Sequence, residues 1–343
     1  MITSTQYSIL FASTFALVGA LTPVMRRIAL KTNFVDRPNA AHKSHQEPIP
    51  YLGGVAIIVG IVAIVYGAIF TQNNFKNDFW LATSLLGPAL ILGVVGLIDD
   101  RKALPPLPRF IAQTAAGVFT ATLIIATDTV GIPSGNSFLD AVITVVWIVG
   151  ISNSINFFDN LDGGAAGAVA ATSFGLFLIT YNNGQFLISA TSLTIFAAML
   201  GFLIWNKSPA KIYMGDAGAL FLGTVIAVLT IRLNPDVPSQ TISFAIPLLL
   251  LAVPILDTSV AVVSRVRRGR SIFQGGHDHL SHRLMRKGFN KRQSGYALWS
   301  LAAIFAGIAT TIATTENDPT SLVVLSAIFW IGLFFTFLKS ADE

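Results

Sequence analysis

Long apolar runs separated by short polar connections dominate the chain. A helix of about 20 residues crosses the apolar core of a bilayer, and eleven runs have roughly that length, at residues 7–30, 52–70, 79–98, 108–127, 137–155, 165–181, 186–205, 217–234, 242–263, 295–314 and 320–338. Lipid tolerates no unpaired backbone groups, and no segment alternates with the period of barrel strands, so the runs are expected to be helices. The pattern predicts an all-α polytopic membrane protein with about eleven transmembrane helices.

The basic residues divide between the two sets of connections. Of the 22 Lys and Arg residues, all but Lys76 and Arg232 lie at or near one set of alternate connections or at the C-terminus. Because cytoplasmic loops are enriched in Lys and Arg, this division predicts an external N-terminus and a cytoplasmic C-terminus. The first run is followed by Arg26, Arg27 and Lys31 and preceded by no positive charge, which reverses the layout of a cleavable signal peptide and predicts a retained helix.

Composition narrows the class of protein further. Hydrophobic residues make up 53% of the 343 residues and charged residues 11%, with a mean hydropathy of +0.68, which excludes a single soluble core. The absence of cysteine excludes disulfides, thiolate metal sites and cysteine nucleophiles. The net charge of +5 is explained by the cytoplasmic loops and requires no nucleic acid. We expect one integral membrane domain, residues 1–343.

Acidic residues gather on the predicted cytoplasmic face. The motif GLIDD ends the third run with Asp99 and Asp100. Acids at the C-terminal end of a helix oppose its macrodipole, so a metal or a substrate cation is a candidate to stabilise them, although two acids could also simply mark the membrane boundary. In KIYMGDAGALFLG, Asp216 precedes an apolar run, where it could serve as a helix N-cap or lie beside a bound phosphate.

A polar segment interrupts two apolar runs. In NSINFFDNLDGGAAG, Asn153, Asn156, Asp159 and Asp162 recur every three residues, and on a continuing helix they would lie along one face. The alternative is an Asn/Asp/Gly-rich turn between two helices. We prefer the first interpretation, because a turn does not require four polar residues at helical spacing.

Two further loops carry histidines. RVRRGRSIFQGGHDHLSHRLMRKGFNKR holds His277, His279 and His282 among nine Lys or Arg residues. The outer charges are typical of a loop that touches anionic lipid, whereas the histidines could bind pyrophosphate. A zinc site is disfavoured, because cysteine and the HExxH spacing are absent. DRPNAAHKSHQEPIPYLGG carries Lys43 and His45 and, taken alone, is a loop punctuated by Pro.

This combination of residues points to phosphate chemistry at the membrane surface. Carboxylate and amide oxygens without cysteine suit a hard cation such as Mg²⁺, which keeps waters and bridges to phosphates. Charges cost about 2.5 to 3.5 kcal/mol each at the bilayer centre, so those retained near it usually serve function. A nucleotide donor from the cytoplasm and a lipid phosphate acceptor could meet at this depth. Phosphoryl transfer then needs positioning and charge neutralisation rather than a strong nucleophile.

Five motifs follow one another over a core of about residues 36–290: DRPN...HKSH...PIPYLGG, GLIDD, NSINFFDNLDGGAAG, YMGDAGALFLG and HDHLSHRLMRKG. In this order they resemble the motifs of the polyprenyl-phosphate N-acetylhexosamine-1-phosphate transferases (the WecA/TagO/MraY superfamily), and they are closest to the WecA/TagO branch. The resemblance implies transfer of N-acetylhexosamine 1-phosphate, first of all GlcNAc-1-phosphate, from a UDP-sugar to polyprenyl (undecaprenyl) phosphate. UMP is released, in the membrane step that initiates cell-envelope polysaccharide synthesis (EC 2.7.8 type).

The resemblance also implies roles for individual residues. Asp216 and Asn156 are the implied ligands of Mg²⁺, with Mn²⁺ as an alternative ion. The implied catalytic acids are Asp99, as base or orienter of the lipid phosphate, with Asp100 beside it, and Asp159 and Asp162 nearer the nucleotide. The implied substrate-binding residues are Lys43, His45, Asn153, His279, His282 and Arg283.

Two positions depart from the family pattern. The family loop often reads HxHH, where this chain has Ser281 at the middle position, and Asn160 replaces the first Gly of the usual DGxDG. A turn that Asn tolerates is therefore expected at Asn160.

Several alternatives stay open. Within the enzyme class, the alternative is an MraY-like phospho-MurNAc-pentapeptide transferase, disfavoured by the absence of an HHH run. A secondary transporter is the alternative of another class, but its acids should lie near the midplane and come from paired repeats. The identity of the sugar, a one-step or two-step mechanism and a homodimer all stay open. The implied location is the cytoplasmic membrane, and the implied partners are the bilayer, the UDP-N-acetylhexosamine donor and the polyprenyl phosphate acceptor.

Overall fold

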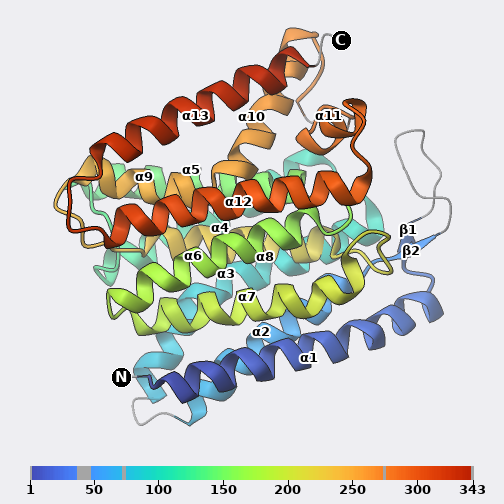
Figure 1. Ribbon diagram of the computed structural model, residues 1–343. Helices are drawn as coiled ribbons and strands as arrows, with labels where there is room; N and C mark the ends of the chain where they lie inside the picture. Colours follow the sequence, from blue (N-terminus) through green and yellow to red (C-terminus); the bar gives the residue numbers. More distant parts are fainter. Residues whose placement is uncertain (1, 37–47, 72–74, 273–275, 341–343) are drawn as a thin grey trace.

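Helices are the main element of the computed structural model, which describes residues 2–36, 48–71, 75–272 and 276–340 (Figure 1). The helices are α1 Ser4–Lys31, α2 Gly53–Phe70, α3 Phe75–Lys102, α4 Pro106–Ala126, α5 Ser137–Phe158, α6 Gly164–Asn182, α7 Phe186–Asn206, α8 Gly215–Ile231, α9 Gln240–Leu250, α10 Ala252–Arg267, α11 Leu280–Arg286, α12 Lys291–Thr314 and α13 Thr320–Lys339. The short strands β1 Val35–Asp36 and β2 Ile49–Pro50 pair antiparallel. The prediction of a helical, multi-pass membrane protein is therefore confirmed.

The number of membrane crossings is less sharply defined than the helical class. In the described ranges, nine helices are long and apolar enough to span a bilayer, and α9 with α10 makes a tenth candidate. The helix α8 is apolar but has only 17 residues. The termini lie toward opposite ends of the helix array (Figure 1), as an odd number of crossings would require. The count of eleven and the orientation in the membrane stay predictions.

The expected single span 242–263 is broken into α9 and α10, which meet at a bend of 75°. Pro254 has no N–H to donate to the carbonyl of Leu250, so one helical hydrogen bond is missing at the bend. The hydroxyl of Thr172 on α6 donates to that carbonyl instead, at 2.7 Å. The break is thus stabilised by a neighbouring helix, which is how irregular backbone is tolerated inside a membrane protein.

The helix α8 forms the centre of the fold. Nearly all of its residues are buried, and α2, α3 and α5 pack against it. A helix that is hydrophobic on every side belongs in such a core. Its N-terminus, which carries Asp216, is therefore enclosed by the ends of other helices, and this enclosure determines where the candidate site lies.

Candidate active site

The C-terminal turn of α3 meets the first turn of α8. The carboxylate of Asp100 accepts hydrogen bonds from the backbone N–H groups of Asp216, at 2.8 Å, and of Ala217, at 3.1 Å. These N–H groups have no partner within their own helix, and the positive end of the α8 dipole favours the negative charge. Asp100 therefore caps α8 from another helix, and these hydrogen bonds offset part of the cost of burying its charge at the unfavourable end of α3.

Asp216 itself is not the N-cap of α8, so that interpretation of the sequence was wrong. The N-cap residue is Met214, which makes no side-chain cap hydrogen bond to the described residues, and Asp216 lies in the first turn. Its carboxylate accepts a hydrogen bond from the Asn156 amide of α5, at 2.6 Å. The two residues implied as metal ligands are thus in direct contact.

Arg109, in the first turn of α4, links the two acidic motifs. Its Nη1 lies 2.5 Å from Asp99 Oδ2 and 3.5 Å from Asp216 Oδ2. The other oxygen of Asp99 accepts from the backbone N–H of Leu104 at 2.6 Å, so both oxygens of this buried carboxylate are occupied. Sequence reasoning missed Arg109, although a cation at the start of an apolar run shortly after GLIDD was a usable signal.

The polar segment between α5 and α6 divides into a helix end and a turn. Asn153 and Asn156 lie on α5, but the helix ends at Phe158, and Gly163 adopts a positive φ of 70° before α6 begins. The expectation that all four polar residues share one helical face was wrong for Asp159 and Asp162, which belong to the turn. Glycine adopts this backbone conformation without steric strain, so it permits the tight reversal.

Asp159 and Asp162 face different neighbours. Burial raises the pKa of the Asp159 carboxyl well above its ordinary value, and the carboxylates of Asp216 and Asp100 raise it further. Asp162 instead accepts a hydrogen bond from the backbone N–H of Ala210, at 3.1 Å, in the connection between α7 and α8. A cation bound beside Asp159 would therefore favour the charged form of its carboxyl.

Asn153 is engaged away from this acidic cluster. Its Nδ2 donates to Gln113 Oε1 on α4 at 2.7 Å, and Gln113 Nε2 donates back to Asn153 Oδ1 at 3.3 Å. Gln113 is buried. The reciprocal pair ties α4 to α5 and helps to place Arg109 beside Asp216; contact of Asn153 with substrate stays a prediction.

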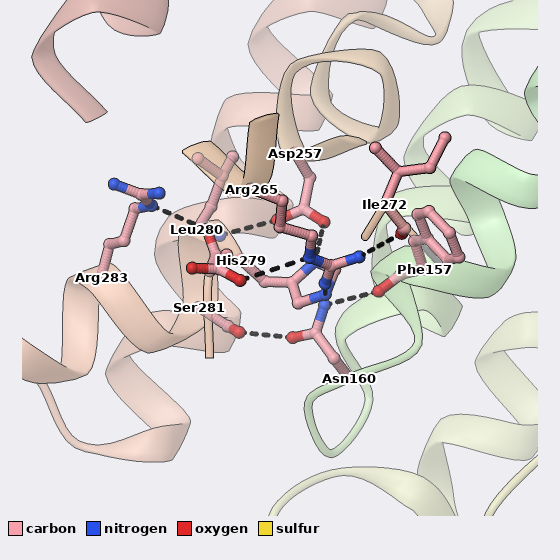
Figure 2. Close-up of polar contacts among 10 residues, drawn as sticks. Phe157, Asn160, Asp257, Arg265, Ile272, His279, Leu280, Ser281 and Arg283 are labelled. Atoms are coloured by element: carbon pink, nitrogen blue, oxygen red, sulfur yellow. Dashed lines mark hydrogen bonds and ion pairs between the residues drawn. The ribbon is translucent and has the colours of Figure 1, made fainter. Parts of the chain in front are cut away.

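The histidine segment, residues 277–283, lies against α10 (Figure 2). His279 is buried, with its Nδ1 2.7 Å from Asp257 Oδ2 of α10. Burial, and then the adjacent imidazoles of His277 and His279, lower the pKa of His282 to about 4, so His282 is neutral at pH 7. Arg283 is fully buried and donates to the carbonyls of Asp278 and Phe337, which ties α11 to the end of α13.

The two departures from the family pattern lie in contact with each other. The hydroxyl of Ser281 donates to the Asn160 side-chain oxygen, and the Asn160 amide donates to the carbonyl of Phe157 at 2.7 Å (Figure 2). The hydrogen bond joins the histidine segment to the α5–α6 turn. The two unusual residues thus act together as one link, which neither position reveals alone.

The loop motif DRPNAAHKSHQEPIPYLGG, residues 36–54, reaches the candidate site with its last residues. Lys43 and His45, with the segment 37–47, lie outside the described residues. After this segment, the carbonyl of Pro50 accepts from the backbone N–H of Tyr213 at 2.9 Å, and Gly54 N donates to the carbonyl of Met214 at 2.9 Å. The end of the early motif therefore docks directly on the segment that leads to Asp216.

The donor set fits Mg²⁺. Asp216 and Asn156 offer carboxylate and amide oxygens, and Mg²⁺ is commonly held by one or two carboxylates together with waters and substrate phosphates. In the part of the chain that the structure describes, no three acidic or histidine side chains converge in a preformed metal cluster.

Asp257 and Arg265 were also missed by sequence reasoning. Asp257 is fully buried on α10, within the apolar run expected at 242–263. An ionisable residue inside a transmembrane segment is a candidate functional residue by default, so the signal was present.

Comparison with known proteins identifies related chains. The model of glycosyl transferase family 4 matches residues 81–234. A probable undecaprenyl-phosphate N-acetylglucosaminyl 1-phosphate transferase of Bacillus subtilis is 32% identical over 324 residues, which cover 93% of this chain and 85% of the relative. A decaprenyl-phosphate N-acetylglucosaminephosphotransferase of Mycobacterium tuberculosis is 32% identical over 318 residues, 84% of this chain and 78% of the relative.

A more distant relative represents the other branch of the superfamily. The phospho-N-acetylmuramoyl-pentapeptide-transferase of Staphylococcus carnosus is 28% identical over 319 residues, covering 87% of this chain and 92% of the relative. The resemblance seen in the sequence motifs is therefore confirmed, and the transporter alternative is set aside. The chain belongs to glycosyl transferase family 4, as a member of the polyprenyl-phosphate sugar-1-phosphate transferase superfamily.

Proposed function

We propose that this protein transfers N-acetylglucosamine 1-phosphate from UDP-N-acetylglucosamine to undecaprenyl phosphate and releases UMP. The observation that carries the proposal is the junction of α3, α4, α5 and α8, where Asn156, Arg109 and the GLIDD acids surround Asp216. N-acetylglucosamine is preferred because the relatives of 32% identity are named for it. The setting is the cytoplasmic face of the cytoplasmic membrane, at the start of cell-envelope polysaccharide synthesis.

In this proposal Asp216 and Asn156 hold Mg²⁺. The ion would neutralise charge on the donor pyrophosphate when bound. Asp100 keeps Asp216 in place through the backbone of α8, so its contribution is to position the metal ligand. Asp159 and Asp162, in the turn that follows Asn156, face the nucleotide side of the site.

Asp99 and Arg109 serve the acceptor. A phosphate oxygen of the lipid attacks the phosphorus that bears the sugar, and the bond from that phosphorus to the oxygen of UMP breaks. Because the acceptor is already an oxyanion, no general base is required, and direct attack is preferred to an aspartyl-phosphate intermediate. Asp99, whose oxygens are both occupied, orients Arg109, and the planar guanidinium pairs with phosphate oxygens.

The proposal is tested by measuring UMP release from the purified protein in lipid nanodiscs. UDP-GlcNAc, UDP-GalNAc and UDP-MurNAc-pentapeptide are each supplied with and without undecaprenyl phosphate, with Mg²⁺, with Mn²⁺ or with a chelator. We expect UMP only when donor and acceptor are both present, fastest with UDP-GlcNAc, lost on chelation and restored by either ion.

Each other result contradicts a named part of the proposal. Release with only the muramoyl pentapeptide donor would assign the protein to the other branch, which the 28% identical relative represents. Release that survives chelation would contradict the metal ion. No release with any pair would contradict the reaction itself.

Replacing Arg109 by Gln should reduce UMP release by about 10² to 10³-fold, the usual effect of removing one group that stabilises charge in a transition state. The change removes the only cation that the structure places within ion-pair distance of both Asp99 and Asp216 among the described residues. Lys102→Gln, which removes an exposed cation at the end of α3, is the matched control and should keep nearly full activity. Equal rates for Arg109→Gln and the control would exclude Arg109 from the reaction.

A further inference from the structure

Asp257 is an acid enclosed by the fold with two partners. It lies on α10 and has no exposed surface. Its Oδ2 is 2.7 Å from His279 Nδ1, and its Oδ1 accepts the backbone N–H of Leu280 at 2.7 Å (Figure 2). Both oxygens of the carboxylate therefore hold the start of α11, a short helix of seven residues that has little stability of its own.

The second ring nitrogen of His279 is also occupied. Its Nε2 lies 3.3 Å from Arg265 Nη2. A guanidinium carries only donors, so Nε2 must accept, and Nδ1 must then carry the proton that is donated to Asp257. The two charged neighbours on α10 thus specify one neutral tautomer of His279, with the proton on Nδ1.

Arg265 is itself held in place. Its Nε donates to Asp278 Oδ2 at 3.2 Å, and its Nη1 donates to the carbonyl of Ile272 at 2.9 Å. Asp278 also pairs with Arg268, at 3.1 Å. The guanidinium lies over the ring of Phe157, 5.8 Å from its centroid, at the end of α5. The position of Arg265 is therefore constrained by Asp278, Ile272 and Phe157, and Arg265 constrains His279 in turn.

The histidine segment connects this buried group to the acidic cluster. The hydrogen bond from Ser281 to Asn160 and the edge contact of His279 with Phe157, at 6.3 Å between ring centroids, both reach the α5–α6 segment. That segment also carries Asn156 and Asp159. A change in the orientation of His279 is thus transmitted to the turn that borders the metal ligands.

We propose that Asp257 is a positioning residue for the transfer reaction, and that it acts by holding His279 as the neutral tautomer protonated on Nδ1. The proposal rests on the proposed function. In this state Nε2 has no proton to donate, and a pyrophosphate offers only acceptors. His279 therefore orients the histidine segment instead of donating to the donor phosphates, and direct contact with the donor is left to its neighbours, such as His282.

The test is Asp257→Asn, which keeps the size of the side chain. An amide can satisfy only one of the two N–H groups that Asp257 accepts, because its other atom is a donor. If the amide oxygen stays with Leu280, the amide N–H faces Nδ1 and forces the proton of His279 to Nε2, against Arg265. We expect UMP release to fall about 10- to 100-fold, the usual cost of losing a partner that orients a functional side chain.

The tautomer is read directly by ¹⁵N NMR of histidine-labelled protein, in which the chain contributes only five histidines. The signal of His279 is assigned by its absence in His279→Gln. We expect the Nδ1-protonated form in the unchanged protein and its loss in Asp257→Asn. Asp140→Asn, which alters a buried acid at the start of α5, is the control and should leave the His279 signal unchanged.

A double variant separates positioning through His279 from a general structural effect. If Asp257 acts through His279, then Asp257→Asn combined with His279→Gln should be no slower than His279→Gln alone, within about two-fold, because coupled residues are not additive. Losses that multiply would overturn the proposal. So would an Nε2-protonated or a charged His279 in the unchanged protein, a result that does not depend on the folding of Asp257→Asn.

The outcome for the proposed function is distinguishable from these results. The tautomer is measured without substrates, so it can be established even if no donor and acceptor pair yields UMP. In that case the reaction would be wrong while the arrangement around His279 stood. Conversely, the unchanged protein could release UMP and the Asp257→Asn variant could release it at the same rate. That result would support the reaction and overturn the positioning role of Asp257.

Discussion

Replacing Asp216 by Asn should abolish UMP release while leaving the protein folded and inserted in the membrane. The amide oxygen can still accept the hydrogen bond from Asn156, so the packing of α5 against α8 is preserved. The negative charge that attracts Mg²⁺ is lost, and a neutral amide is a poorer ligand for a hard cation. The loss should be at least about 10²-fold, as expected when charge stabilisation is removed from a reacting phosphate. UMP release and the elution profile in detergent are the measurements.

The control for this variant lies near the other end of the same helix. Asp236 is exposed and follows α8 by a few residues, so Asp236→Asn removes the same charge far from the site and should retain full activity. Mg²⁺ titration of both proteins would show whether excess metal partly restores the Asp216 variant. Full turnover by Asp216→Asn would contradict the assignment of Asp216 as a metal ligand.

Replacing Gly96 by Ala should damage stability and activity together. Gly96 lies on α3, one turn before the GLIDD acids, where its backbone touches the first turn of α8. A Cβ atom at this position would lie 2.6 Å from Ala217 N and closer still to the carbonyl oxygen of Asp216. Backbone atoms cannot rotate away, so α3 and α8 must separate, which typically costs about 1 to 3 kcal/mol.

The loss of activity should follow from the same displacement. Asp100 reaches the N–H groups of Asp216 and Ala217 only at the present helix separation. We expect UMP release to fall at least about 10-fold, since small displacements of reacting groups have large effects. The midpoint of thermal unfolding, measured by intrinsic tryptophan fluorescence, should fall as well. Gly150→Ala on α5 is the control, because no described atom lies within 4 Å of its added Cβ. Equal thermal midpoints and equal rates of UMP release for Gly96→Ala and Gly150→Ala would contradict the close contact between α3 and α8.

Much of the candidate site could be predicted from the motifs, but not how its members contact one another. Asp99, Asp100, Asn156 and Asp216 do converge, as the shared cytoplasmic face suggested. The sequence interpretation sought a metal or a substrate cation for the GLIDD acids, whereas Asp100 is stabilised by the N-terminus of α8 and Asp99 by Arg109. Partners such as Arg109 lie outside the motifs, and their contribution depends on how helices pack.

Local geometry accounts for the other differences. The repeat of polar residues every three positions suggested a continuing helix, but α5 ends at Phe158, and the glycines that follow allow the chain to reverse. The run 242–263 looked continuous by hydropathy, yet Pro254 removes a hydrogen bond that Thr172 then compensates from another helix. The periodicity of polar and apolar residues describes one segment at a time. It therefore cannot show that a hydrogen bond lost in one helix is replaced by a side chain from another helix.

The sequence alone determined that this chain is a helical multi-pass membrane protein of a transferase family. In lipid, long apolar segments must satisfy their backbone hydrogen bonds internally and therefore form helices. The charges of the loops and the order of the motifs are also properties of the sequence itself. Only the tertiary structure decided which polar groups pair: Asp100 with the start of α8, Asp257 with His279, and Ser281 with Asn160. These pairs join residues 22 to 121 positions apart, and hydrogen bonds act over about 3 Å, so helix packing alone brings them into range.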